Sequence, residues 1–417
     1  MPRMQDWQRY LSPRFYHDKL REKGVGWCLR RGSIGLFQLM VVILTCPLSF
    51  LLYLIGIRFL PIAAQHIGHL VCEPDCYVKE GILGMPRHSF VIVLVKPNRV
   101  SNPHLLQYWR QHLRIISSPL LYPLLAPLSW SPILQIDIRH YFLALRSTAH
   151  YYAVQKAWAE RPPLLALSES DRECGLDCLR TLGVPEDGWF VSVHCRESGY
   201  APNEAQTYRN ADIHNYILAM KAIVEKGGWC IRMGDATMKP LPPMEHVIDY
   251  AHLSVKSDWM DIFLCASCKF FLGGSSSLSG AACVFGVPSA VANQAPMAVI
   301  LPTGSGDLGI PKLVWSRDRQ RYLTFGEVLG STTGDFRATS LFTDAGLMVE
   351  ENSPEDIKDL ALEMLDAVRG AVKYTDEDAR LQERFKSLLR PGHYSYGGRA
   401  RVGKEFLRKY ASLLSPA

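Results

Sequence analysis

The feature that most constrains the fold is a series of short apolar segments, each followed at once by small or polar residues. Four such segments lie near the middle of the chain, at 189–193, 229–233, 270–273 and 288–293. Stretches typical of helices separate them, at 211–226, 257–267 and 277–285. Continuous apolar runs of this length are typical of strands buried on both faces of a parallel sheet. The alternation therefore predicts an α/β protein built on a doubly wound parallel sheet.

The ends of these predicted strands carry residues suited to a ligand. Open α/β sheets bind ligands at the carboxyl ends of their strands. The residues of this kind after the first three strands are His194, Arg196, Glu197, Gly234, Asp235, Gly274, Ser275, Ser276 and Ser277. An arginine fork suits a phosphate, and small residues let backbone N–H groups and hydroxyls surround one. The pattern predicts a phosphate site, the alternative being a structural Arg196 paired with a carboxylate.

Composition narrows the class of protein. A chain of 417 residues with 48% hydrophobic and 21% charged residues is long enough for two globular domains and an appendage. The net charge of +6 is modest, and the basic residues are not interleaved with aromatics, so nucleic acid is not an expected partner. Eleven cysteines fit free thiols in a reducing compartment. The lone Cys265-x-x-Cys268 has no second pair, so no metal site is expected.

Near the N-terminus, residues 33–57 form a run of 25 residues without a charged side chain. That length suffices for a membrane helix. The preceding basic segment, 1–32, favours the cytoplasmic face of the inner membrane, with the folded domains in the cytoplasm. Pro47 falls within the run. The segment is therefore either a kinked span or a re-entrant helix–break–helix, and the cysteine pattern and the phosphate site favour the second.

A second apolar stretch lies at 115–136 and contains Pro119, Pro123, Pro127 and Pro132. Four prolines exclude a regular helix on propensity grounds. Two interpretations stay open for this stretch: a hydrophobic loop lying on the bilayer, or a connection packed into the core.

Several segments of the chain resemble a bacterial glycosyltransferase family. The matching segments are 208–213, 225–235, 238–242, 247–251, 256–264, 271–273 and 285–288. The stretch 66–70 matches more weakly, since family members tend to have arginine where His66 stands. The resemblance covers roughly 57–352 and leaves the membrane segment outside.

That family is distantly similar to fucosyltransferases and is expected to have the GT-B fold, in which two doubly wound Rossmann-type domains face a cleft. The resemblance implies an acceptor domain over 58–165 and a nucleotide-sugar domain over 166–375. A helical tail follows at 376–417. In the fucosyltransferase relatives the arginine of a His-x-Arg motif contacts the donor diphosphate, and His194-Cys195-Arg196 matches it here. Those enzymes need no metal, so neither a metal nor another cofactor is expected.

Roles for the remaining candidates follow from chemistry. Arg196 and the loop of Ser275, Ser276 and Ser277 (the serine loop) would bind the diphosphate, with Lys239 as a second cation. Asp235 would accept from the base or ribose of the nucleotide, or else cap its own turn. An inverting enzyme also needs a base for the acceptor hydroxyl. The candidates for that base, which the sequence does not separate, are His66, His69, Glu73 and Asp75 in the loop after the first predicted strand, and Glu197.

These observations predict a membrane-associated glycosyltransferase of hexosyl- or fucosyltransferase type. It would transfer a sugar from a nucleotide-sugar donor to a glycan or lipid-linked acceptor in surface polysaccharide biosynthesis. Two alternatives stay open. One is a phosphoglycosyltransferase acting on polyprenol phosphate, for which Glu73 and Asp75 are the acids near the bilayer. The other is a non-catalytic scaffold of a polysaccharide assembly complex.

Overall fold

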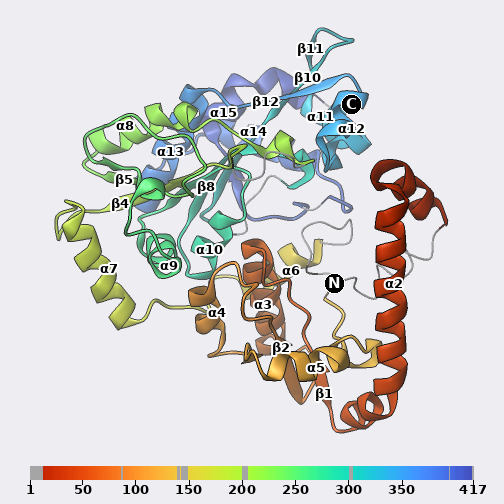
Figure 1. Ribbon diagram of the computed structural model, residues 1–417. Coiled ribbons are helices and arrows are strands. Elements are labelled where there is room, and N and C mark those ends of the chain that lie inside the picture. Colours follow the sequence, from red (N-terminus) through yellow and green to blue (C-terminus); the bar gives the residue numbers. More distant parts are fainter. Residues whose placement is uncertain are drawn as a thin grey trace. The chain divides into compact units, whose positions relative to one another are not determined.

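A computed structural model describes residues 13–85, 88–138, 141, 149–199, 205–299, 304–393 and 395–415 (Figure 1). By its internal contacts the chain divides into two compact units. The first unit comprises Met1–His66, Gly84–Ser101 and Leu106–Ile138. The second comprises Ile67–Leu83, Asn102–Leu105 and Arg139–Ala417. The α/β class expected from the sequence is confirmed, because each unit holds a parallel sheet.

The first unit is built on a three-stranded parallel sheet. Its strands β1 (Ile57–Phe59), β2 (Phe90–Leu94) and β3 (Arg114–Ile116) lie in the order β1-β2-β3. The helical elements around them are α2 (Pro13–Leu54), α4 (Pro103–Trp109), α5 (Leu121–Ser129) and the 3-10 turn η1 (Pro132–Leu134). The core of this unit is a small cluster of Phe59, Ile92, Leu128 and Leu134.

Helix α2 runs without interruption through Pro47. The expected helix–break–helix is therefore wrong for the backbone of this segment. A proline removes only one N–H donor, so a long apolar helix can continue through it. Residues Leu29–Leu54 are long and apolar enough to cross a membrane, and only 11% of the most apolar window is buried.

The stretch at 115–136 also departs from expectation, because nine of its residues form helix α5. The two prolines of α5 explain why. Pro123 is the third residue of the helix, where a backbone N–H has no acceptor within the helix. Pro119 and Pro132 lie outside the helix, so of the four prolines only Pro127 removes an internal hydrogen bond.

The second unit is built on a seven-stranded sheet whose paired strands are all parallel. Its strands are β4 (Phe190–His194), β5 (Trp229–Arg232), β6 (Val247–Ile248), β7 (Phe271–Gly273), β8 (Ser289–Gln294), β9 (Leu308–Pro311) and β13 (Arg401–Val402). Their order is β13-β9-β8-β7-β4-β5-β6. The chain builds outward from β4 through β5 to β6, then returns to add β7 on the other side. The sheet is doubly wound, as predicted, and its order reverses between β4 and β7.

Helices cover both faces of this sheet. Helix α8 packs with α13 against β5, β8 and β9, while α10 packs with α9 and α3 and contacts β7 and β8. The helices of the unit are α3 (Ile67–Ile82), α6 (Ala149–Trp158), α7 (Glu169–Thr181), α8 (Ile217–Glu225), α9 (Asp258–Ser267), α10 (Leu278–Val284), α11 (Phe325–Gly330), α12 (Thr339–Asp344), α13 (Pro354–Val368), α14 (Asp376–Ser387) and α15 (Lys404–Lys409). A small antiparallel sheet joins β11 (Arg321–Tyr322), β10 (Leu313–Ser316) and β12 (Leu347–Glu350).

Two domain boundaries expected from the sequence differ from the division that the internal contacts give. The chain does not divide at residue 166, because α3 and the residues from 139 onward join the second unit. The segment 376–417 is not an appendage either. Its strand β13 pairs with β9, and Phe385 and Phe406 both contact Phe325 in the main core. These apolar faces are buried by the sheet unit, which a free tail could not achieve.

Candidate functional site

The site is built where the strand order of the large sheet reverses. His194, the last residue of β4, lies next to the loop that follows β7. Its Nδ1 donates to Met233 O at 3.1 Å, so its Nε2 accepts from Ser276 Oγ at 3.1 Å. Burial, together with the positive charge of Arg232, lowers the pKa of His194 to about 4. The imidazole is therefore neutral at pH 7 and joins the two strands across the crevice where such sheets bind ligands.

Two arginines lie close to these strand ends. Arg196 is only 7% exposed, and its carbonyl accepts from Ala211 N at 2.8 Å. Arg209 donates from Nε to Ser275 O at 3.0 Å, in the loop after β7. Burial and the nearby Arg337 lower the pKa of Arg209. Arg209 falls within the resemblance, but no pattern in the sequence predicts it in the site, because it lies in a 3-10 turn that is far along the chain from any strand end.

The serine loop is held from several directions. The Ser275 hydroxyl donates to Ala295 O at 2.9 Å, and Gly274 N donates to His194 O at 2.9 Å. Ser276 Oγ also accepts from Leu278 N at 3.4 Å. Ser277 precedes α10 and is exposed. The hydroxyls of Ser275 and Ser276 therefore shape the loop, which leaves backbone N–H groups and the arginines to meet an anion.

Glu197, predicted as a candidate base, is held in a buried ion pair. Its Oε2 accepts from Arg232 Nη2 at 2.8 Å and from Lys239 N at 3.2 Å. Burial raises the pKa of Glu197, and Arg232 opposes that rise. Arg232 is 1% exposed and also donates to Asp249 Oδ1 at 2.9 Å. These contacts favour a structural role for Glu197 in holding the loop after β4 against the loop after β5.

The predicted nucleotide contacts lie in the turn after β5. Asp235 Oδ1 accepts from Thr237 N at 2.8 Å, which is the turn-capping alternative. Gly234 has φ +156°, and a Cβ there would lie 2.4 Å from Met238 Sδ. Lys239 is exposed, and its Nζ donates to Asp212 Oδ2 at 2.8 Å, which raises the pKa of Lys239. Lys239 is thus a surface lysine with a carboxylate partner.

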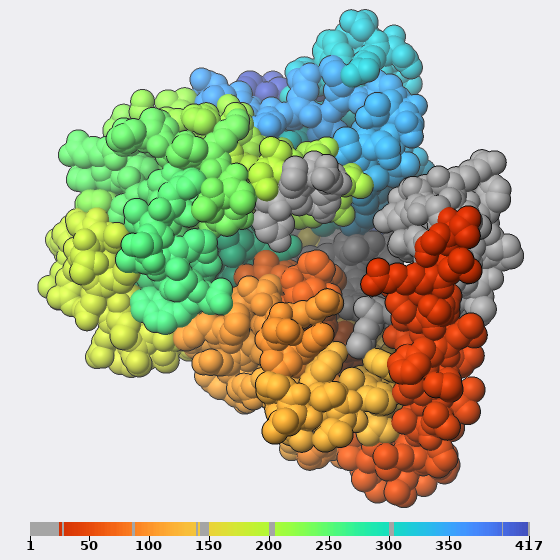
Figure 2. Space-filling view, viewed as in Figure 1, coloured from red at the N-terminus to blue at the C-terminus, as the bar shows by residue number. Residues whose placement is uncertain are grey.

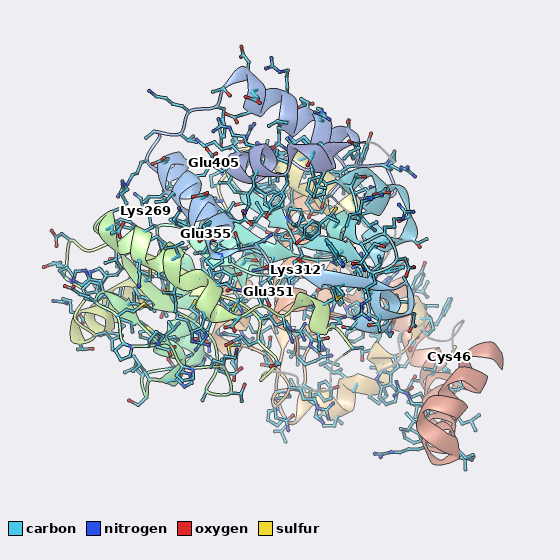
Figure 3. The ribbon with its side chains drawn as sticks, turned by 90° about the horizontal axis from the view of Figure 1, so that it is seen from above. Cys46, Lys269, Lys312, Glu351, Glu355 and Glu405 are labelled. Atoms are coloured by element: carbon cyan, nitrogen blue, oxygen red, sulfur yellow. The ribbon has the colours of Figure 1, made fainter. Side chains whose placement is uncertain are left out.

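The sequence analysis missed a buried cation at the same edge of the sheet. Lys312 follows β9 and is 4% exposed. Its Nζ donates to Asn210 O at 2.5 Å, and no carboxylate in the described part of the chain forms an ion pair with it. Burial lowers the pKa of Lys312 to about 8, and Glu351 opposes this (Figure 3). An uncompensated buried lysine at a ligand-binding edge is typical of functional sites.

The other predicted bases lie in or next to α3 rather than in a loop. Glu73 and Asp75 are both buried inside this helix, which corrects their expected position. Asp75 Oδ2 accepts from Lys79 Nζ at 2.8 Å and is held in a buried ion pair. His69 Nδ1 contacts Glu73 Oε1, and its side chain is 35% exposed. His66 is the last residue of the first of the three segments that make up the first unit.

Of these candidates, His69 lies near the serine loop. A Cβ on its neighbour Gly68 would lie 2.6 Å from Ser277 Oγ and 2.8 Å from Ser277 Cβ. The backbone at the start of α3 therefore closely approaches the loop that follows β7. Within the second unit, this contact brings the start of α3, which carries His69, close to the serine loop.

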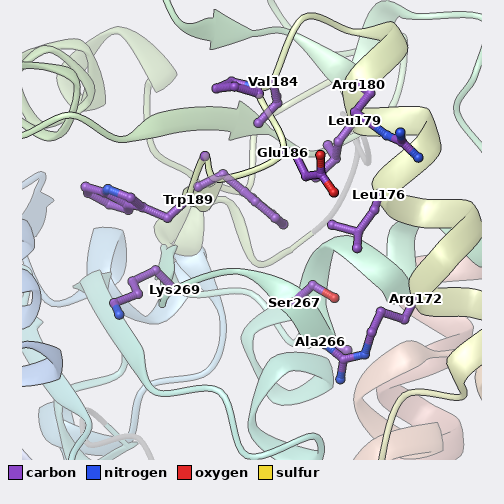
Figure 4. A pocket seen from close by; sticks show the side chains of 13 residues that line it. Arg172, Leu176, Leu179, Arg180, Val184, Glu186, Trp189, Ala266, Ser267 and Lys269 are labelled. Carbon is purple, nitrogen blue, oxygen red and sulfur yellow. The ribbon is translucent and has the colours of Figure 1, made fainter.

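The described residues include no group of three or more His, Cys, Asp or Glu side chains arranged to hold a metal ion. A cavity of about 340 Å³ lies at the opposite edge of the large sheet, where β4 and β7 begin (Figure 4). Its lining includes Arg172, Trp189 and Lys269 and none of the strand-end residues described above. The cavity is therefore separate from the candidate site.

Comparison with known proteins gives matches to structures only. No protein-family model matches the sequence, and no curated protein matches it either. The ADP-heptose LPS heptosyltransferase II of E. coli is 13% identical, with 56% of this chain and 84% of that chain covered and a TM-score of 0.35. A glycosyl transferase family 9 protein from Veillonella parvula is 11% identical, with coverages of 56% and 79% and a TM-score of 0.37. E. coli heptosyltransferase WaaC with ADP is 10% identical, with coverages of 61% and 91% and a TM-score of 0.30. At these values the similarities carry no argument about activity, which depends on the site itself.

Proposed function

We propose that the protein is a membrane-associated glycosyltransferase that moves a sugar from a nucleotide-sugar donor to a glycan or lipid-linked acceptor. The observation that carries the proposal is the junction between β4 and the loop after β7, where the strand order reverses. There a neutral His194 ties β4 to the serine loop, with Arg196 and Arg209 beside it. Surface polysaccharide biosynthesis is the process that such an enzyme would serve.

In this reaction negative charge develops on the departing nucleoside diphosphate. Preorganised cations and N–H groups stabilise such a leaving group without reorganising during the reaction. Arg196 and Arg209 supply the charge in the proposed mechanism, and the backbone N–H groups of Ser275 and Ser277 would donate to the diphosphate, because those of Gly274 and Ser276 already donate to His194 O and Gly274 O. His194 is a positioning residue, because it acts on the donor only through Ser276. No metal is assigned a role in this mechanism.

We assign the acceptor base to His69. The Glu73 carboxylate faces Nδ1, which fixes the tautomer and leaves Nε2 on the other side of the ring. A carboxylate in this position also stabilises the imidazolium formed when the histidine takes a proton. The approach of Gly68 to Ser277 supports this assignment, because it brings the start of α3, which carries His69, close to the serine loop. Attack by the deprotonated hydroxyl from the face opposite the diphosphate would invert the anomeric centre.

A lipid-linked acceptor fits the exposed apolar helix. Only 11% of the most apolar window of α2 is buried, unlike a core helix of a soluble protein. An enzyme anchored by this helix would meet lipid-linked sugars at the membrane surface. A phosphoglycosyltransferase is less favoured, because Asp75 is buried and paired with Lys79, and Glu73 contacts His69.

The deciding experiment is a thermal-shift screen of the full chain in detergent. ADP, GDP, UDP, CDP and dTDP would each be added with and without EDTA. We expect one diphosphate to raise Tm equally in both conditions, and Arg196→Met and Arg209→Met to abolish the shift. Arg172→Met, at the opposite edge of the sheet, is the matched control. A chain that no nucleotide stabilises would overturn the proposal and favour a non-catalytic scaffold.

A further inference from the structure

Helix α5 exposes its largest apolar side chains. Leu120, just before the helix, is 79% exposed, while Leu121 is 46% and Leu124 is 70% exposed. Pro119 and Pro123 are also exposed. A soluble monomer rarely leaves such a contiguous apolar surface uncovered.

The other side of the same helix packs inward. Leu128 belongs to the core cluster of the first unit, and Leu125 packs against it. No charged residue occurs between Ile115 and Ile136, so no charge interrupts the exposed surface along the chain. The helix therefore has two apolar sides. Folding of the first unit buries the side with Leu125 and Leu128 and leaves the other exposed to solvent.

The exposed side of α5 continues onto α2. Leu52 of α2 packs against the same core cluster as Leu125, and the two helices are in contact. The last turns of α2 expose Phe50, Leu51 and Leu54 at 56%, 56% and 64%. Figures 1 and 2 show α5 beside this end of α2, at the surface of the same unit. The two helices thus present one apolar surface.

Basic and aromatic side chains lie near this surface. Arg99 is exposed, and its positive charge opposes the rise that burial causes in the pKa of Tyr122 of α5. The Arg114 guanidinium lies 4.4 Å from the ring centre of Phe90, which is 40% exposed. Aromatic and basic side chains around an apolar surface are typical of the headgroup level of a membrane, where arginines meet anionic lipids.

We propose that α5 and the adjoining end of α2 insert together into one leaflet of an anionic phospholipid bilayer. Leu120, Leu121 and Leu124 lie among the acyl chains, and Arg99 and Arg114 meet the lipid phosphates. A bilayer is favoured over a second protein because α2, whose length and composition suit a lipid environment, continues the same surface. The inference rests on the membrane association in the proposed function and on no step of sugar transfer.

The test places a photoreactive benzoylphenylalanine at Leu124 of the full chain in nanodiscs of phosphatidylglycerol and phosphatidylcholine. Leu36 of α2, 70% exposed, is the positive control, and Leu341 of α12, 44% exposed, is the matched negative control. We expect lipid adducts at position 124 to approach those at 36 and to exceed those at 341 at least fivefold. Yields no higher than at 341, or crosslinks to a second copy of the chain, would overturn the proposal.

A second measurement tests the charge of the lipid. Arg99→Gln should lower adduct formation at position 124 severalfold in discs that contain phosphatidylglycerol, but not in discs of phosphatidylcholine alone. Equal yields with and without the substitution in both lipids would overturn the anionic assignment. Nucleotide thermal shifts measured in the same discs report separately on the proposed glycosyltransferase site, so failure of one proposal is distinguishable from failure of the other.

Discussion

His194 and Ser276 form a 3.1 Å hydrogen bond between the end of β4 and the loop after β7. These are the two strands between which the sheet order reverses. The bond is one of the contacts that position the serine loop at the carboxyl ends of the strands, where an α/β sheet binds ligands. Because the histidine is neutral, it adds no charge of its own to this edge of the sheet.

Ser276→Ala should weaken donor binding and stability together. The substitution leaves the buried Nε2 of His194 without its hydroxyl donor, which typically costs about 1–3 kcal/mol. We expect a lower free energy of unfolding in urea and a nucleotide-induced Tm shift reduced by more than half. Ser387→Ala, on the exposed side of α14, should change neither. A Tm shift that survives in Ser276→Ala would show that the loop needs no support from His194.

Four strands of the large sheet, β4, β5, β7 and β8, could be predicted from the sequence, because strands buried on both faces are largely apolar. The strands β6, β9 and β13 were not predicted, and β6 and β13 are only two residues long. The strand order could not be predicted, since pairing depends on contacts between segments far apart in the chain. The histidine and the serine loop were each identified at a strand end, but nothing local shows that they meet. The Gly68 contact with Ser277 is of the same kind, as it joins residues more than two hundred positions apart.

Arg232 and Lys312 were not predicted as buried cations, for the same reason. Each is a single cation beside an apolar segment, and arginine and lysine are usually exposed. A charged residue inside the apolar run at 229–233 was the available signal for Arg232. Helix α5 was wrongly excluded, because a count of prolines does not consider that a proline in the first turn removes no hydrogen bond.

Arg232→Met should be strongly destabilising. It leaves the buried Glu197 and the partly buried Asp249 without their shared cation, and breaking a buried pair in this way costs about 3–5 kcal/mol. Adding Glu197→Gln should recover part of the loss, because the second substitution removes one of the unpaired charges. Urea unfolding of both single variants and the double variant measures the coupling. Strictly additive losses would contradict the ion pair.

Lys312 should make stability depend on alkaline pH. Burial lowers the pKa of Lys312 to about 8 from 10.5, so the unfolded chain binds more protons between these values. Stability should therefore rise as pH increases from about 8 toward 10.5, by at most about 3 kcal/mol. Lys312→Met should lose this rise, while Lys269→Met, at an exposed lysine, should keep it. Parallel pH profiles of the wild type and Lys312→Met in urea unfolding would show that the lysine is not buried in solution.

The approach of α3 to the donor loop is tested by adding one methyl group. Gly68→Ala would place a Cβ 2.8 Å from Ser277 Cβ, closer than such atoms approach, so the loop or the helix start must move. A displacement of this size between base and donor can cost about a hundredfold in rate. We expect kcat to fall while Tm changes little. Gly392→Ala, where nothing lies within 4 Å, is the control.

His69 and Glu73 should differ in how their loss affects turnover. His69→Gln removes the proposed base, and general-base catalysis typically contributes about 10²–10⁴-fold, so kcat should fall by that factor with KM nearly unchanged. Glu73→Gln keeps the ring but weakens its orientation, so a smaller fall is expected, and the two losses should not add, because Glu73 acts through His69. Single-turnover sugar transfer with matched donor and acceptor measures both. Full activity in His69→Gln would move the base elsewhere, and an additive double variant would show that Glu73 acts independently of the histidine.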